Sequence, residues 1–381
     1  MTFVRPEVLT TPPVHHGALD YGELRHLDLH PDDVLDFSAN VNPYGPPPGV
    51  RAALEAVNLA HYPDREALAL REALAAHHGV LPAHLVVGNG VAELIWLVAL
   101  AFVRAGDRVL ILTPTYGDYA RAVRLMGGQV ISCEASPRKG FTPPLEAAER
   151  LLAEAQPRLC FICTPNNPTG QVVPADLIQT WATRCAHTLF VVDEAYINFV
   201  PGLPSAIAPA RPNLLVLRSM TKDYALAGVR LGYAVGHADL VDGLARVRPS
   251  WNVSALAQAA GLAALAGQEH LKRTVRQLGE AKRDLTRELE ALGFPVVPSA
   301  THFFLVKVGH APRFRAALIK QGILVRDCTS FGLPAFVRVA ARRAEENERL
   351  VVAFKRVREL TGMAGRCSPT SGYPLALNKK F

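Results

Sequence analysis

Strand-length apolar runs alternate with helical patterns between about residue 49 and about residue 265, and this alternation most constrains the fold. The runs are "HLVVG", "RVLIL", "QVISC", "RLCFIC", "LFVVD" and "LLVLRS", separated by stretches such as "DREALALREALAAHHG" and "PADLIQTWATRCAH". Such alternation predicts an α/β fold in which helices cover both faces of a mostly parallel sheet. Because such sheets bind ligands beyond the carboxyl ends of their strands, residues that directly follow the runs are candidates for function.

The pattern also divides the chain. Its 381 residues exceed the usual size of one domain. We predict a large domain over residues 49–267 and a smaller α+β domain over residues 268–364, which begins with a long helical stretch. Residues 1–48 are rich in Pro and His and are expected to pack on the smaller domain, whereas residues 365–381 are expected to form a flexible tail.

Apolar runs and charge exclude several classes of protein. The longest apolar run, "LIWLVALAFV", is shorter than the roughly 18 residues that a membrane span needs, and the N-terminus has no signal region, so we predict a cytoplasmic protein without a membrane partner. The net charge of +7 is spread over stretches of mixed sign, which argues against a nucleic-acid partner and suits ligands that carry phosphate or carboxylate. Cys160 and Cys163 form a lone C-x-x-C pair, so no metal site is predicted.

Two turns follow predicted strands, and one of them suits a phosphorylated ligand. "GNG" follows "HLVV" and ends at Gly90, where a helical pattern starts. The exposed N–H groups at the start of a helix favour a phosphate, although a simple tight turn is an equal alternative. "TPNNPTG" follows "FIC" and places Asn167 in a turn, and taken alone a turn without a functional role is an equal alternative.

An acid and a lysine follow two further runs. Asp193 comes directly after "LFVV", where a buried carboxylate without a cationic partner is costly, and Lys222 follows "LLVLRS". A lysine whose ammonium pKa falls can form an imine with an aldehyde. Pyridoxal phosphate needs such a lysine, an acid for its pyridine nitrogen, a phosphate cup and groups that hold its phenolic oxygen. The strand ends provide all four, so we predict pyridoxal 5'-phosphate as the cofactor.

The stretches "NNPTG", "DEAY" and "SMTKDYALAGVRLGY" resemble the fold-type I pyridoxal-phosphate enzymes, the aspartate aminotransferase superfamily, over residues 15–361. The resemblance implies a large domain with a mostly parallel seven-stranded sheet, a smaller α+β domain, and a homodimer with active sites at the subunit interface. It implies that Lys222 is the Schiff-base lysine, that Asp193 pairs with the pyridine nitrogen and that Tyr196 holds the ring oxygen. The implied cofactor-binding residues are Gly90, Val91, Tyr116, Asn167, Asp193, Tyr196, Ser219, Lys222 and Arg230, with Tyr62 contributed to the neighbouring subunit.

Two subfamilies are similar to the chain, the L-threonine-O-3-phosphate decarboxylases and the histidinol-phosphate aminotransferases. "HHGALDYG", "LDFSANVNPYGPP" and "FVRVAARRAEENERL" are similar to decarboxylase segments and favour that reaction, which makes 1-aminopropan-2-ol O-phosphate for cobalamin biosynthesis. The aminotransferase of histidine biosynthesis is the alternative, and a non-catalytic regulator that binds the cofactor is a remote one.

The decarboxylase resemblance also implies a substrate site. Arg338 is expected to bind the α-carboxylate of the substrate, because a guanidinium forks onto a carboxylate through two parallel hydrogen bonds. For Arg326 and Arg342, a surface ion pair is the alternative to a place in the site. The further candidates, for the substrate phosphate and for orientation, are His16, Gly17, Asn40, Asn167 and Arg326.

Overall fold

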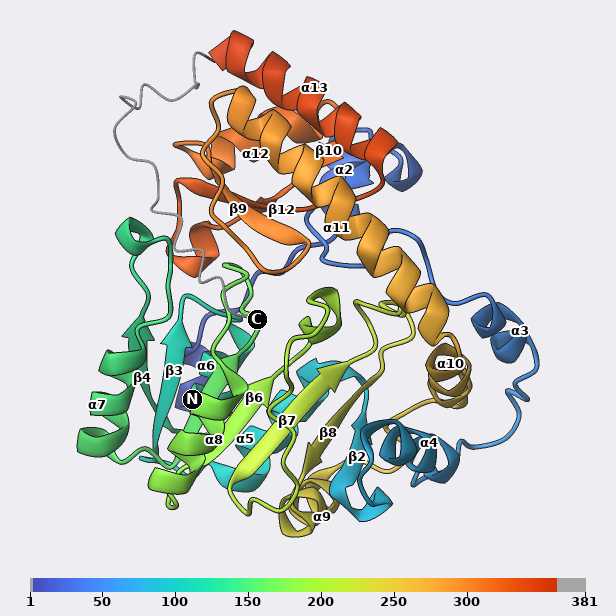
Figure 1. The fold of residues 1–381 in the computed structure, drawn as a ribbon, viewed down its shortest axis with the longest axis vertical. Helices are drawn as coiled ribbons and strands as arrows, with labels where there is room; N and C mark the ends of the chain where they lie inside the picture. Colours follow the sequence, from blue (N-terminus) through green and yellow to red (C-terminus); the bar gives the residue numbers. More distant parts are fainter. Residues whose placement is uncertain (1–2, 362–381) are drawn as a thin grey trace.

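A seven-stranded sheet forms the larger lobe of the computed structural model, which describes residues 3–361, and smaller sheets lie in the other lobe (Figure 1). Its strand order is β2-β8-β7-β6-β5-β3-β4, and every neighbouring pair is parallel except those that β8 makes with β2 and β7. The strands are β2 (Leu85–Gly88), β3 (Arg108–Thr113), β4 (Gln129–Glu134), β5 (Leu159–Cys163), β6 (Leu189–Asp193), β7 (Leu214–Ser219) and β8 (Gly232–Gly236). The predicted α/β class with a mostly parallel seven-stranded sheet is confirmed.

Helices cover both faces of this sheet because alternate residues of each buried strand point in opposite directions. Val109 and Ile111 pack towards α5, α6 and α9, whereas Leu110 packs towards α7 and α8. Cys160 and Cys163 of β5 belong to different faces in the same way, so the two thiols do not converge. The helices of this lobe are α3 (Gly49–Glu55), α4 (Leu68–His78), α5 (Gly90–Phe102), α6 (Asp118–Leu125), α7 (Leu145–Ala155), α8 (Ala175–Arg184), α9 (Ala238–Val247) and α10 (Ala255–Ala266).

The smaller lobe is built on an antiparallel sheet of order β11-β12-β9. The register of this sheet places Arg326 directly opposite Arg338, a pairing between residues that are distant from the cofactor motifs in the sequence. Phe294, Phe314 and Phe354 pack edge to face beneath it, with ring centroids 4.8–5.5 Å apart. Its elements are α11 (Gln268–Ala291), β9 (Phe303–Lys307), α12 (Ala311–Ile319), β10 (Ile323–Leu324), β11 (Arg326–Asp327), β12 (Phe336–Ala340) and α13 (Ala344–Thr361).

The N-terminal segment contains α1 (Pro6–Thr10), α2 (Tyr21–His26) and β1 (Leu35–Asp36), and β1 pairs in parallel with β10 of the smaller lobe. Arg315 of α12 forks onto Glu23 of α2 with distances of 2.6 and 2.5 Å. These contacts hold residues 14–18 beside the ends of the large sheet. The predicted domain limits stay a prediction, and the tail predicted over residues 365–381 lies outside the described residues.

Among residues 3–361, no helix is both long enough and apolar enough to cross a membrane.

Candidate active site

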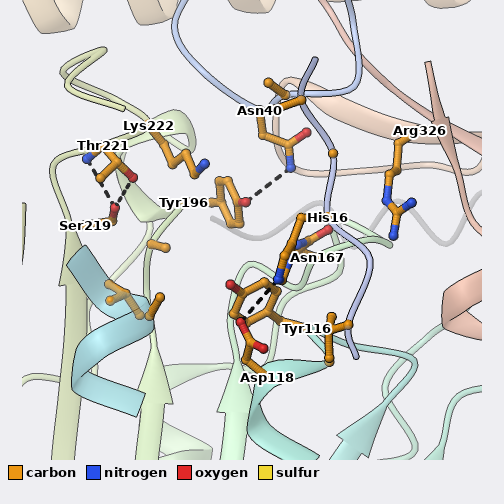
Figure 2. Close-up of a pocket in the computed structure, with 18 of the residues that line it drawn as sticks. His16, Asn40, Tyr116, Asp118, Asn167, Tyr196, Ser219, Thr221, Lys222 and Arg326 are labelled. Atoms are coloured by element: carbon orange, nitrogen blue, oxygen red, sulfur yellow. Dashed lines mark hydrogen bonds and ion pairs between the residues drawn. The ribbon is translucent and has the colours of Figure 1, made fainter. Parts of the chain in front are cut away.

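A cavity of about 480 Å³ opens where β5, β6 and β7 end and α5 begins (Figure 2). Residues 14–18 and 38–41 of the N-terminal segment, together with β11 and β12, form its other wall. This is the edge at which parallel sheets bind ligands. The predicted site residues that line it are His16, Gly17, Asn40, Val91, Tyr116, Asn167, Asp193, Tyr196, Ser219, Lys222, Arg230, Arg326 and Arg338.

Lys222 enters the cavity from the turn after β7, and its main chain is fixed by a 2.9 Å hydrogen bond from the Asn42 N–H to its carbonyl oxygen. Burial, aided by the positive charges of Arg338 and Arg230, lowers the pKa of its ammonium from 10.5 to about 8. The amine is therefore far easier to deprotonate than that of an exposed lysine, as a nucleophile for an aldehyde requires.

Asp193 is the last residue of β6 and is 4% exposed. The Tyr119 hydroxyl donates to its Oδ2 at 2.6 Å, and the Ala195 N–H donates to its Oδ1 at 3.0 Å. Burial raises the pKa of this carboxyl from 3.8 to about 6 even though both hydrogen bonds oppose the shift. A cation beside it would favour the ionised form, so the site suits a protonated ring nitrogen.

The start of α5 forms a cradle with Arg230. Gly90 has a φ of +81°, and a Cβ atom there would lie 2.8 Å from Arg230 Nη2, so the close approach requires glycine. Ser219 and Thr221 share a hydrogen bond of 2.7 Å at the same wall of the cavity (Figure 2). One guanidinium, two hydroxyls and the first N–H groups of a helix form a set of donors for a phosphate.

The opposite wall carries amides, a phenol and an arginine. Arg338 donates from Nη1 to Asn167 Oδ1 and from Nη2 to the Ser38 carbonyl oxygen, while its Nε has no partner. Asn40 donates from Nδ2 to the Tyr196 hydroxyl at 3.2 Å, and its Oδ1 has no partner. Buried polar atoms without partners are costly, which indicates that a ligand completes this wall.

The N-terminal segment brings the remaining predicted residues to this wall. Arg326 Nη2 donates to the His15 carbonyl oxygen and to Ser330 Oγ, both at 2.6 Å. Gly17 lies so close that a Cβ atom would clash with the Ser38 carbonyl oxygen and lie 3.3 Å from Arg338 Nη2. The surface ion pair considered for Arg326 is not formed.

Two predicted residues lie elsewhere. Tyr62 is 79% exposed and stacks on Trp251 with a centroid distance of 4.6 Å, away from the cavity of its own chain. Arg342 donates to the Asp36 carbonyl oxygen and to Glu346, so it forms the ion pair that was its alternative.

Among the lining residues that sequence reasoning missed are Asp118, Tyr119 and Thr221. Asp118 lies 3.5 Å from His16 Nε2, whose ring lies 5.5 Å from that of Tyr116 (Figure 2). Tyr119 holds Asp193, and Thr221 holds Ser219. The spacing "SMT" could have indicated Thr221, because a hydroxyl two residues after a serine can share its hydrogen bonds. Nothing in the sequence places Asp118 beside His16, since the two belong to distant segments.

The pKa of Lys222 leads to a prediction about cofactor attachment. Because only the neutral amine attacks an aldehyde, the attachment of pyridoxal phosphate to the cofactor-free protein should accelerate with pH around a midpoint near 8 rather than 10.5. Stopped-flow absorbance across pH 6–11 measures it, and Arg338→Gln should move the midpoint upwards. A midpoint near that of free lysine in both proteins would contradict the prediction.

The chain matches known proteins over most of its length. Residues 32–354 match the family described as aminotransferase class I and II. A histidinol-phosphate aminotransferase from Symbiobacterium thermophilum is 38% identical over 361 residues, which cover 93% of this chain and 98% of the relative. The crystal structure of a histidinol-phosphate aminotransferase from Sinorhizobium meliloti in complex with pyridoxal-5'-phosphate has a TM-score of 0.82 at 25% identity, over 94% of this chain and 99% of that one.

These comparisons correct the predicted reaction. Eight relatives that are 33–38% identical are all named histidinol-phosphate aminotransferase. The structure of an L-threonine-O-3-phosphate decarboxylase from Porphyromonas gingivalis is also similar, with a TM-score of 0.75 at 28% identity over 85% of this chain and 99% of that one. The prediction of decarboxylation for cobalamin biosynthesis is wrong, because it rested on a few short stretches. Arg338, which lies in one of these stretches, suits a phosphate as well as a carboxylate and therefore does not distinguish the two reactions.

The predicted cofactor stands. The lysine, the buried acid and the glycine cradle fit pyridoxal 5'-phosphate in this structure, and the cofactor-bound neighbour and the family match confirm it. The chain therefore belongs to the aminotransferase class I and II family of pyridoxal-phosphate enzymes, which it matches from residue 32 to residue 354.

Proposed function

We propose that this protein is an aminotransferase that moves the amino group of a phosphorylated amine of the histidinol phosphate type to an oxo acid. The names of its relatives support the substrate class. The observation that carries the proposal is the placement of Arg326 and Arg338 side by side, on paired strands, in the wall of the cavity that Lys222 enters. Such an enzyme binds a phosphate in one half of its cycle and carboxylates in the other, and guanidinium groups bind both.

Residues from several strand ends would hold the cofactor. Ser219, Arg230 and the first N–H groups of α5 would bind its phosphate, and Asp193 would keep a proton on its ring nitrogen. Asn167 and Tyr196 would donate hydrogen bonds to its ring oxygen. When bound, pyridoxal phosphate supplies an electron sink for the bond that breaks at the α-carbon of the substrate.

The remaining residues orient the substrate and move its proton. Arg338 and Arg326 would grip the phosphate, so that the α-carbon faces Lys222. With its lowered pKa, the Lys222 amine can take the proton from the α-carbon at neutral pH and return it to a neighbouring atom. Water would supply the oxygen of the ketone that leaves, and the amino group, held on the cofactor, would pass to the oxo acid that enters next, which gives up its oxygen as water and leaves as an amino acid.

An assay of both half-reactions tests the proposal. The purified protein, loaded with pyridoxal phosphate, should form glutamate only when histidinol phosphate and 2-oxoglutarate are both present. Unphosphorylated histidinol should react at least about tenfold more slowly, because a buried arginine loses its charged partner. The absence of glutamate from the complete mixture would refute the proposed function.

Removing the guanidinium of Arg338 should mainly weaken substrate binding. We expect Arg338→Gln to raise the KM for both the phosphorylated amine and the oxo acid by about 10- to 100-fold, since a charge-assisted hydrogen bond contributes about 1.5–3 kcal/mol. Steady-state kinetics measures the change, with Arg246→Gln as the control because Arg246 is exposed and pairs with Asp242 of its own helix. An unchanged KM for both substrates would remove Arg338 from the site.

We also propose a homodimer in which Tyr62 acts on the neighbouring subunit. Tyr62 is exposed and lies outside the cavity of its own chain. Its stacking on the exposed Trp251 supports the proposal, since an exposed aromatic pair suits a contact surface. We expect Tyr62→Phe to raise the Kd for pyridoxal phosphate by several-fold through one lost hydrogen bond to phosphate, without changing the subunit number. Light scattering and cofactor titration measure the two quantities, and a monomeric wild type would sink the idea.

A further inference from the structure

A second cavity, of about 800 Å³, lies apart from the catalytic one. It is formed by α11, by residues 198–202 that follow the "DEAY" segment, and by residues 300–302 that precede β9. The two cavities share no lining residue. Since α11 runs from the smaller lobe to the end of α10 in the larger lobe (Figure 1), the second cavity lies between parts of both lobes.

The wall that α11 contributes carries an excess of positive charge. Lys272, Arg276, Lys282 and Arg283 line the cavity, and Glu280 is the acid among the lining residues. Lys272 pairs with Glu269 of its own helix at 2.8 Å. Within residues 3–361, the other three cations form no ion pair. Arg276 and Arg283 are exposed, so solvent screens part of the repulsion among the three charges, and an anion between them would remove more of it.

A glycine lies at the centre of this charged face. Gly279 is three residues from both Arg276 and Lys282, so helical spacing makes each of these two cations a neighbour of the glycine. A Cβ atom at Gly279 would meet only Arg283 Nη1, at 4.0 Å, so space is open there. Glycine weakens the interior of a helix, and here it leaves the backbone accessible between the cations.

A buried histidine closes the cavity on the opposite side. His302 is 3% exposed, and neither of its ring nitrogens has a hydrogen-bond partner. Its ring centroid lies 3.9 Å from that of Phe199, which also lines the cavity. Burial, aided by the charges of Lys282 and Arg338, lowers the pKa of His302, so the ring is neutral and adds no further positive charge to the cavity.

We propose that this second cavity binds a phosphate dianion, either free or as the ester group of a small metabolite, between Arg276, Lys282 and Arg283. A dianion neutralises more of the three charges than one carboxylate can. Guanidinium groups match phosphate oxygens in pairs, and the ammonium of Lys282, which is half-buried and donates to the Ser299 carbonyl oxygen, acts as a point charge.

Calorimetry on the loaded holoenzyme tests the proposal with inorganic phosphate and, separately, with glycerol 3-phosphate. Two variants alter the second cavity by different means: Gly279→Leu fills the space and leaves every charge, and Arg276→Gln with Lys282→Gln removes two charges. Each variant should raise the Kd for phosphate at the second cavity at least about tenfold and leave the catalytic site unchanged. Arg326→Gln should weaken only the catalytic class, and Arg287→Gln is the matched control, because Arg287 lies on the same helix and pairs with Asp284.

The outcomes separate this site from the catalytic one. If all phosphate binding is lost in Arg326→Gln and is unaffected by Gly279→Leu and by the double variant, the proposal is overturned. Since leucine favours a helix more than glycine does, Gly279→Leu should remain folded, and thermal unfolding of each variant checks this. Binding of inorganic phosphate but not of the ester would identify free phosphate as the ligand. None of these readouts requires amino transfer, so the proposal stands or falls independently of the proposed reaction.

Discussion

Lys222→Ala should abolish amino transfer and the near-visible absorbance of the covalently attached cofactor. The expected loss in rate is at least about a thousandfold, or about 4 kcal/mol of transition-state stabilisation, because no other amine among the lining residues can replace it. The charge of Lys222 does not stabilise the fold, because burial disfavours the ammonium and lowers its pKa. The variant should therefore fold at least as stably as the wild type.

Absorbance spectra and turnover assays of the purified variant measure both effects. Lys307→Ala is the matched control, since Lys307 is exposed at the end of β9 and lies outside the cavity. Adding pyridoxal phosphate should not restore the absorbance of the attached cofactor, because the variant has no amine at this position to which the cofactor can attach. Wild-type turnover in Lys222→Ala would refute the assignment of this residue.

Asp193→Asn should slow amino transfer by about a hundredfold while leaving cofactor binding largely intact. An amide cannot hold a proton on the ring nitrogen as a carboxylate does, so the ring becomes a poorer electron sink. A hundredfold corresponds to about 2.7 kcal/mol. Steady-state kinetics at saturating cofactor measures it, with Asp239→Asn as the control because that carboxylate is 91% exposed. A loss smaller than about tenfold, or about 1.4 kcal/mol, would count against the role of Asp193.

The same substitution should change the pH dependence of stability in the cofactor-free protein. The folded state holds a proton on Asp193 up to about pH 6, whereas the unfolded state loses it near 3.8, so this group's contribution to stability falls as pH rises between these values. The full cost of the ionised, buried carboxylate at pH 7 is on the order of 3 kcal/mol. Cofactor-free Asp193→Asn should lack this loss, and thermal unfolding at pH 5 and pH 7 compares the two proteins.

The elements of the large lobe could be predicted from the sequence because their determinants are local. Buried parallel strands such as β5, β6 and β7 need continuous apolar runs, and the turns that follow them carry the polar residues. Lys222, Asp193, Ser219 and Asn167 could therefore be selected as neighbours before any coordinates were known. The structure places them around one cavity, and their individual roles stay predictions.

The sequence by itself determined the sheet, the strand-end residues and the cofactor they suit, because each depends on side chains within a few residues of a strand. Only the tertiary structure decided what surrounds them. The register of β11 on β12 brings Arg326 beside Arg338, and the return of the N-terminal segment brings His16 to Asp118. The second cavity likewise depends on how α11 packs against residues 198–202. Such contacts join distant parts of the chain, and local hydrophobic periodicity carries no information about them.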